Sequence, residues 1–197
     1  MPKRQIPKEL EESLMQVALR IAKRGEGALF VIGETEYDLL IDQAIPSFKA
    51  TENPKLLESL ALIDGAVIID KEGNVKAYGA LVKITTPFKN HGTRHSAGLS
   101  ASQNPDNLVI LVSEEDRKVR IMKDSKIIMQ LDALEKDVEK SVPQVVNILE
   151  SIGVGTIGTI GAGLLVPSLG IALLPGVVIF GSAYYLGKFL TNKFAGN

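Results

Sequence analysis

Charged residues almost disappear from this 197-residue chain after residue 150, and this break constrains the fold more than any other feature. All 23 acidic residues lie at or before Glu150. Only Lys188 and Lys193 carry charge after it, and residues 151–187 carry none. The pattern divides the chain into a mixed polar and apolar body and an apolar tail.

The body is long enough to bury one domain core, and its composition excludes several classes of function. A net charge of −1 gives no basic field for nucleic acid. The absence of cysteine excludes disulfides and thiolate metal sites. The two histidines, His91 and His95, are too few for a structural zinc site. The N-terminus is charged and shows no secretory signal.

Apolar periodicity predicts helices and strands throughout the body. Apolar residues recur at helical spacing in residues 8–24, with Gly25 and Gly27 ending that helix. Further predicted elements are strands at 28–32 and 107–113, a helix at 52–63, hairpins at 64–70 with 74–84 and at 118–122 with 126–131, and a helix at 132–150 with Asp132 as N-cap and a break near Pro143. This order predicts an α/β fold with a mixed central β-sheet flanked by helices.

Three domain segments follow from these patterns. Residues 1–24 hold an amphipathic helix that packs on the domain, residues 25–150 form the domain itself, and residues 151–197 form an apolar, glycine-rich tail. We expect that tail to be helical.

The stretch HGTRHSAGLSAS, residues 91–102, is suited to an anion such as phosphate. Gly92 permits a tight turn, and a helix opening after it would present free N–H groups to the anion. Arg94 can bind phosphate through two hydrogen bonds, and Thr93 and Ser96 can donate from their hydroxyls. The alternative is a capped surface helix with a solvated arginine.

Two acidic segments are also candidates for chemistry. In LIDGAVIID, Asp64 precedes an apolar strand, and Gly65 and Ala66 are small enough to admit a ligand, although an Asp-Gly pair often marks only a turn. In VSEED, residues 112–116, three acids follow a strand; they form either a solvated turn or a site for a hard cation.

Taken together and in order, these segments resemble the diadenylate cyclase family, which makes the second messenger cyclic di-AMP from two ATP molecules. The matching segments are GALFVI (27–32), DGAVIID (64–70), YGALVKI (78–84), GTRHSAGLSAS (92–102) and LVSEED (111–116). Their order and spacing make the resemblance specific, and it covers roughly residues 10–132.

The resemblance implies a face-to-face homodimer or higher homo-oligomer with one ATP per protomer. Each 3′-hydroxyl would attack the α-phosphate of the opposite ATP, and pyrophosphate would leave. Asp64 and Arg94 would be catalytic, and Asp64 and Glu115 would hold Mg²⁺ or Mn²⁺. The implied nucleotide-binding residues are Gly65, Ala66, Gly79, Leu81, Thr93, Arg94, His95, Ser96, Ser113 and Glu114.

One position departs from the family pattern. The family commonly reads Arg-His-Arg where this chain reads Arg-His-Ser, so Ser96 keeps a donor and loses a charge. A charge-assisted hydrogen bond contributes about 1.5–3 kcal/mol. The alternative function is therefore a catalytically weak or inactive ATP-binding module of the same fold, tethered to a membrane and acting by interaction.

The apolar tail predicts contact with membrane lipid through residues 151–190. A spanning helix needs about 20 apolar residues, so the tail allows one long span or a hairpin of two short ones turning near VPSLG, residues 166–170. A hairpin returns Lys188 and Lys193 to the cytoplasmic side, as the positive-inside tendency favours. The alternative is a buried helical hairpin used for oligomerisation in water. We therefore expect a cytoplasmic catalytic domain anchored to the cell membrane.

Overall fold

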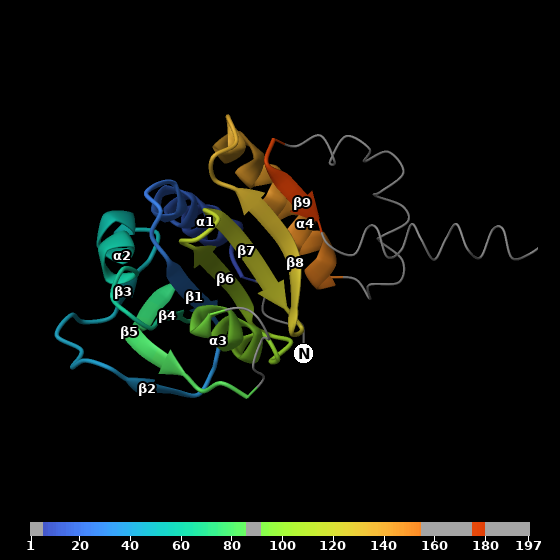
Figure 1. Cartoon of the computed structure of the whole chain (residues 1–197). Coiled ribbons are helices and arrows are strands. Elements are labelled where there is room, and N and C mark those ends of the chain that lie inside the picture. Colours follow the sequence, from blue (N-terminus) through green and yellow to red (C-terminus); the bar gives the residue numbers. More distant parts are fainter. Residues whose placement is uncertain (1–5, 86–91, 155–174, 180–197) are drawn as a thin grey trace, which may run out of the picture.

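A mixed β-sheet forms the centre of the protein in the computed structural model (Figure 1), which describes residues 6–85, 92–154 and 175–179. The strands are β1 (Ala28–Ile32), β2 (Tyr37–Leu39), β3 (Phe48–Lys49), β4 (Ala66–Ile69), β5 (Asn74–Val82), β6 (Leu108–Ser113), β7 (Lys118–Lys123), β8 (Lys126–Asp132) and β9 (Val177–Ile179). Their order is β2-β5-β4-β1-β6-β7-β8-β9, and β3 also pairs with β5. Within the described residues, β1 and β4 run parallel and the other pairs antiparallel, which confirms the predicted mixed sheet.

Helices cover both faces of this sheet (Figure 1). They are α1 (Lys8–Lys23), α2 (Pro54–Leu60), α3 (Thr93–Ala101) and α4 (Val142–Val154), with a 3₁₀ helix η1 (Val138–Ser141) leading into α4. The core on one face joins α1, α2 and α4 to Phe30 and Ile32 of β1. The core on the other face joins α3 to Leu29 and Val31. Because successive strand side chains point to opposite faces, β1 is apolar at every position.

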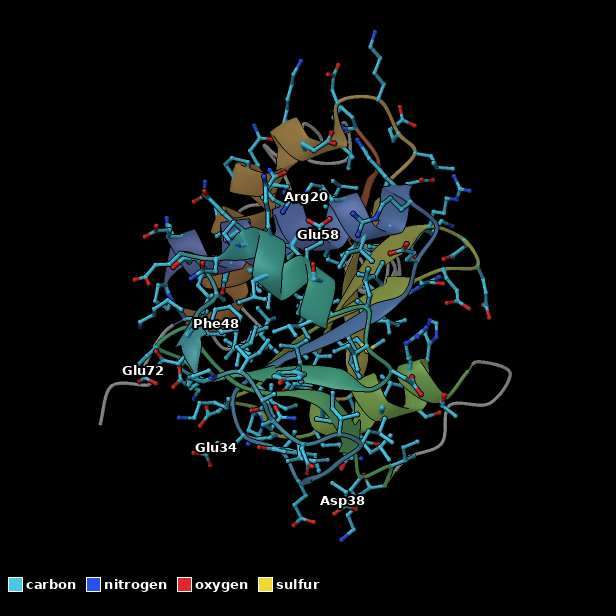
Figure 2. All side chains as sticks on the ribbon, turned by 90° about the vertical axis from the view of Figure 1, so that its left-hand side faces the viewer. Arg20, Glu34, Asp38, Phe48, Glu58 and Glu72 are labelled. Carbon is cyan, nitrogen blue, oxygen red and sulfur yellow. The ribbon has the colours of Figure 1, made fainter. Side chains whose placement is uncertain are left out.

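Helix α1 is tied to α2 by charge as well as by packing. Figure 2 shows Arg20 of α1 beside Glu58 of α2, and the Arg20 Nε donates to the Glu58 carboxylate at 2.8 Å. Arg24 donates to the same carboxylate. Burial by itself would raise the pKa of Glu58, but the hydrogen bonds from Arg20 and Arg24 hold it below its ordinary value.

The helix predicted at 132–150 begins ten residues later than expected. Asp132 ends β8, and its carboxylate accepts a hydrogen bond from the N–H of Leu134 at 3.0 Å, so it caps a turn and not a helix. Pro143 lies in the first turn of α4, where its missing N–H costs nothing. The predicted break near Pro143 is therefore the place where the helix starts.

Part of the predicted apolar tail belongs to the sheet. Val177–Ile179 form β9, which pairs antiparallel with Met129–Leu131 of β8, because β-branched side chains favour a strand once an edge is available. Helix α4 runs to Val154, four residues past the predicted boundary at residue 150, and the division into three segments stays a prediction.

The rest of the predicted tail, residues 155–174 and 180–197, lies outside the described residues. Among the helices that the structure describes, none combines the length and the hydropathy that a bilayer crossing requires.

The irregular pairing of β4 with β5 sets the position of Asp64. The register shifts twice along this pair. Gly65 has a φ of +99°, and a Cβ placed there would lie 2.8 Å from the backbone nitrogen of Ala80. The two strands approach so closely only because residue 65 has no side chain, and Asp64 leaves the sheet at this point.

We expect Gly65→Ala to destabilise the protein by at least about 2 kcal/mol, because strained backbone and a backbone collision add together. Gly79→Ala is the matched control. Gly79 has a φ of +60°, and its Cβ would meet the side chains of Ile41 and Ile63 at 3.3 Å, which can yield. Its expected cost is about 1 kcal/mol. Urea unfolding of both variants measures the difference in stability. A loss in Gly79→Ala that equals or exceeds the loss in Gly65→Ala contradicts this account.

Glu11 of α1 is a buried carboxyl group. The residue is only 6% exposed to solvent. Its Oε2 accepts no hydrogen bond from the part of the chain that the structure describes. Burial and the charge of Glu150 raise the pKa of Glu11 to about 7, against the opposing charges of Lys123 and Lys8.

We expect Glu11→Gln to stabilise the protein at about pH 8 and to leave its stability nearly unchanged at about pH 4. The unfolded chain loses the Glu11 proton near pH 4.5, whereas the folded chain keeps it until about pH 7. The wild-type free energy of unfolding therefore falls as pH rises through this window, by about 3 kcal/mol at most. Urea titrations across the window measure it, and parallel profiles for the two proteins would show that Glu11 is not responsible.

Candidate functional site

The site lies at one edge of the sheet, where three segments meet because of the strand directions. β4 runs parallel to β1, with Phe30 beside Val67, so both strands begin at the same edge. β6 runs antiparallel to β1, with Ala28 beside Val112, so β6 ends at that edge. The start of α3 lies there as well.

A polar hollow of about 230 Å³ opens between these segments. It is lined by Asp64 before β4, by Gly92, Thr93, Arg94 and His95 at the start of α3, and by Leu111, Val112, Ser113, Glu114 and Glu115 at the end of β6. The structure thus brings together the three segments that the sequence indicated separately.

Arg94 lies between two carboxylates of this hollow. Its Nη1 lies 3.1 Å from Oε2 of Glu114, and its Nη2 lies 4.0 Å from Oδ1 of Asp64. The Asp64 side chain is 84% exposed and that of Glu114 56% exposed. Solvent-exposed pairs of this kind contribute little to stability, so the carboxylates and the guanidinium can exchange partners when a charged ligand arrives.

The N-terminus of α3 adds a second means of binding an anion. Gly92 caps the nine-residue helix, and its carbonyl accepts from the N–H groups of His95 and Ser96. The N–H groups of Thr93 and Arg94 come before the first helical hydrogen bond and point out of the helix end. No heavy atom of the described structure lies within 4 Å of a Cβ built on Gly92, so that side of the helix end is open.

Other residues predicted from α3 and β6 have structural contacts. His95 and Ser96 are buried on α3, and of the two only His95 lines the hollow. Ser113 is buried, and its hydroxyl donates to the Asp116 carboxylate. Burial alone would raise the pKa of Asp116, but hydrogen bonds from Arg120 and Ser113 hold it below its ordinary value. Their predicted contacts with nucleotide stay predictions.

The predicted residues of β4 and β5 lie outside the lining of the hollow. Gly65 allows the close, irregular pairing of the two strands, Gly79 has a φ of +60°, and Ala66 is buried between the sheet and α3. Leu81 is 47% exposed. Of these four predicted residues, Leu81 alone presents an exposed apolar side chain.

The predicted metal ligands are only partly assembled. Asp64 and Glu115 both line the hollow, but the carboxylate that shares Arg94 with Asp64 is Glu114. Within the described residues, no three His, Cys, Asp or Glu side chains form a cluster that could hold a metal ion. Two carboxylates suit the way Mg²⁺ is commonly bound, with the remaining oxygens coming from phosphate and water.

Sequence reasoning missed Gly27 as part of the site. It is buried directly before β1, and a Cβ on it would lie 2.3 Å from Nη1 of Arg94. The available signal was its place as the first residue of the GALFVI segment, but a glycine at the end of a helix has an ordinary explanation as a helix terminator.

Comparison with known proteins identifies the family of this chain. A family model described as DAC, DisA bacterial checkpoint controller nucleotide-binding, matches residues 16–127. A diadenylate cyclase from Methanocaldococcus jannaschii is 31% identical over 138 residues, which cover 61% of this chain and 45% of that protein. A diadenylate cyclase from Listeria monocytogenes is 33% identical over 139 residues, covering 66% and 50%. The chain thus spans about half the length of these relatives.

Structural similarity extends to the fold alone. The crystal structure of DacA from Staphylococcus aureus superposes with a TM-score of 0.50 and 23% sequence identity, covering 74% of this chain and 96% of that one. The mixed sheet, the assembled motifs and the family match over more than half of the residues lead to one conclusion: this chain belongs to the DAC, or DisA bacterial checkpoint controller nucleotide-binding, family.

Proposed function

We propose that this protein is a diadenylate cyclase, which converts two ATP molecules into cyclic di-AMP and two pyrophosphates. The observation that carries the proposal is the position of Arg94. It stands at the N-terminus of α3 and between the carboxylates of Asp64 and Glu114, in an open polar hollow. The family match and the names of its relatives support the substrate class.

Arg94 and the N-terminus of α3 are suited to binding the triphosphate of ATP. A guanidinium binds phosphate oxygens through paired hydrogen bonds, and the free N–H groups of Thr93 and Arg94 add donors aimed at the same charge. As pyrophosphate departs, negative charge grows on the leaving oxygens, and donors already in place stabilise it without reorganising. The ion pair of Arg94 with Glu114 keeps the guanidinium in the hollow beforehand.

Asp64 is suited to activating the nucleophile, the ribose 3′-hydroxyl. A ribose hydroxyl is a poor nucleophile and a carboxylate is a weak base toward it, so Asp64 would mainly help to hold Mg²⁺ or Mn²⁺ and secondarily accept the proton. The second ligand would be Glu114 or Glu115. A bound divalent cation supplies positive charge that favours the ionised hydroxyl.

The reaction requires two copies of the chain. Each new bond joins a 3′-oxygen to the α-phosphorus of the opposite ATP while the bond from that phosphorus to the β-phosphate oxygen breaks, and this occurs twice. One chain contributes one hollow, so we propose a homodimer or higher homo-oligomer whose hollows face each other. Attachment of the apolar C-terminal residues to a membrane would raise the encounter rate of the half-sites by confinement.

The alternative, an ATP-binding module without turnover, is favoured by one observation. Among the described residues that line the hollow, Arg94 is the only lysine or arginine, and Ser96, where the family commonly has a second arginine, is buried in α3. Binding of ATP without release of pyrophosphate would identify this alternative. Absence of any ATP-induced rise in melting temperature would reject both functions.

We expect Asp64→Asn to reduce cyclic di-AMP formation by at least about 100-fold, because it removes the carboxylate that would serve the nucleophile. The melting temperature should hardly change, since the side chain is 84% exposed. Purified full-length protein is incubated with ATP and Mn²⁺, and cyclic di-AMP and pyrophosphate are quantified.

Asp124→Asn is the matched control for this substitution. Asp124 is exposed, lies in the β7–β8 turn away from the hollow, and has a φ of 50°, which asparagine tolerates. It should keep wild-type activity. If the wild type forms no product at concentrations where it is dimeric, the enzymatic proposal fails.

We expect Arg94→Gln to weaken ATP binding by about 10- to 150-fold, the equivalent of losing one charge-assisted hydrogen bond or more. Arg94→Lys should recover part of this loss, because it restores the charge without the paired geometry. Isothermal titration calorimetry with ATP measures both. Arg117→Gln, at an exposed arginine outside the lining, serves as the control; an equal loss there would point to general charge and not to the site.

A further inference from the structure

Gly27 occupies a position where any side chain would collide with the central arginine of the site. It is buried immediately before β1, whose first residue, Ala28, pairs with Val112 near the end of β6. A Cβ built on Gly27 would lie 2.3 Å from Nη1 and 3.0 Å from Cζ of Arg94, and 3.1 Å from Oε2 of Glu114. The Arg94–Glu114 pair therefore lies directly over this glycine.

The backbone at Gly27 gives no other reason for glycine. Gly25, Gly33 and Gly65 have positive φ values, whereas Gly27 does not. Of the atoms within reach of a Cβ at Gly27, the three nearest all belong to the side chains of Arg94 and Glu114. At Gly65, in contrast, the nearest atoms are backbone.

We propose that Gly27 is a positioning residue whose missing side chain leaves the space in which the Arg94 guanidinium is held beside Glu114 and Asp64. A methyl group at residue 27 would push Nη1 from 2.3 Å to the 3.4 Å of an ordinary contact, a shift of about 1 Å. The fold would tolerate this, because only the flexible ends of side chains move. The site would not, since a displacement of about 1 Å in a positioned group costs roughly 100-fold in rate. The catalytic consequence rests on the proposed function.

The test is a double-mutant cycle between Gly27→Ala and Arg94→Gln. We expect Gly27→Ala alone to weaken ATP binding by at least about 10-fold with a small change in melting temperature. In the Arg94→Gln background it should cause no further loss, because the displaced group is gone. An equal loss in both backgrounds would mean that Gly27 acts through the fold, and wild-type affinity in Gly27→Ala would also overturn the proposal.

The control is Gly98→Ala, which lies on the same helix as Arg94. Its added Cβ would meet Sδ of Met122 at 3.0 Å and no atom of Arg94 among its three nearest contacts. Its effect on ATP binding should be small and the same in both backgrounds.

A direct readout separates this inference from the proposed function. The ¹⁵N side-chain resonances of Arg94 are assigned by their loss in Arg94→Gln and compared across the glycine variants. They should move in Gly27→Ala and stay in place in Gly98→Ala, whether or not ATP binds. If they do not move in Gly27→Ala, the positioning role is wrong. If they move but the wild type binds no ATP, the positioning role stands and the proposed function fails.

Discussion

The pairing of β1 with two neighbours of opposite direction is the constraint on which the rest of the structure depends. β1 runs parallel to β4 and antiparallel to β6, so the start of one and the end of the other reach the same edge. Asp64 precedes β4, and Glu114 follows β6, although 50 positions separate them along the chain. Because alternate side chains of β1 pack in different cores, a one-residue slip in its register would move every one of them into the wrong core. The position of the carboxylates follows from that register.

The sequence predicted well those elements whose own residues show a strong pattern. Helix α1 and the buried strands β1 and β6 came directly from apolar periodicity or apolar runs. β2 and β3, of three and two residues, exist only because β5 offers them an edge, and no local pattern reports such a partner. The same holds for β9, which apolar composition alone assigned to a membrane segment.

The candidate site was predictable as a set of segments but not as a set of contacts. The resemblance named Asp64, Arg94, Glu114 and Glu115, and all four line one hollow. It did not show that Arg94 pairs with Glu114, or that Gly65 serves strand pairing, because these depend on distances between strands. Three-dimensional packing also gave Gly27 a role that its helix-terminating position concealed.

Two arginine–carboxylate pairs at the end of β6 show how one chemistry serves two purposes. Arg120 is 9% exposed and donates two hydrogen bonds to Asp116. The Asp116 side chain is 35% exposed, and the hydrogen bonds from Arg120 and Ser113 lower its pKa against the opposing effect of burial. The Arg120–Asp116 pair anchors the turn that carries Glu114. In the Arg94–Glu114 pair, Glu114 lies only two positions before Asp116 along the chain, and the pair is open to solvent. Arg94 can therefore exchange this carboxylate for a phosphate. The Arg120–Asp116 pair thus holds the β6–β7 turn in place, while the Arg94–Glu114 pair can change partners when a ligand binds.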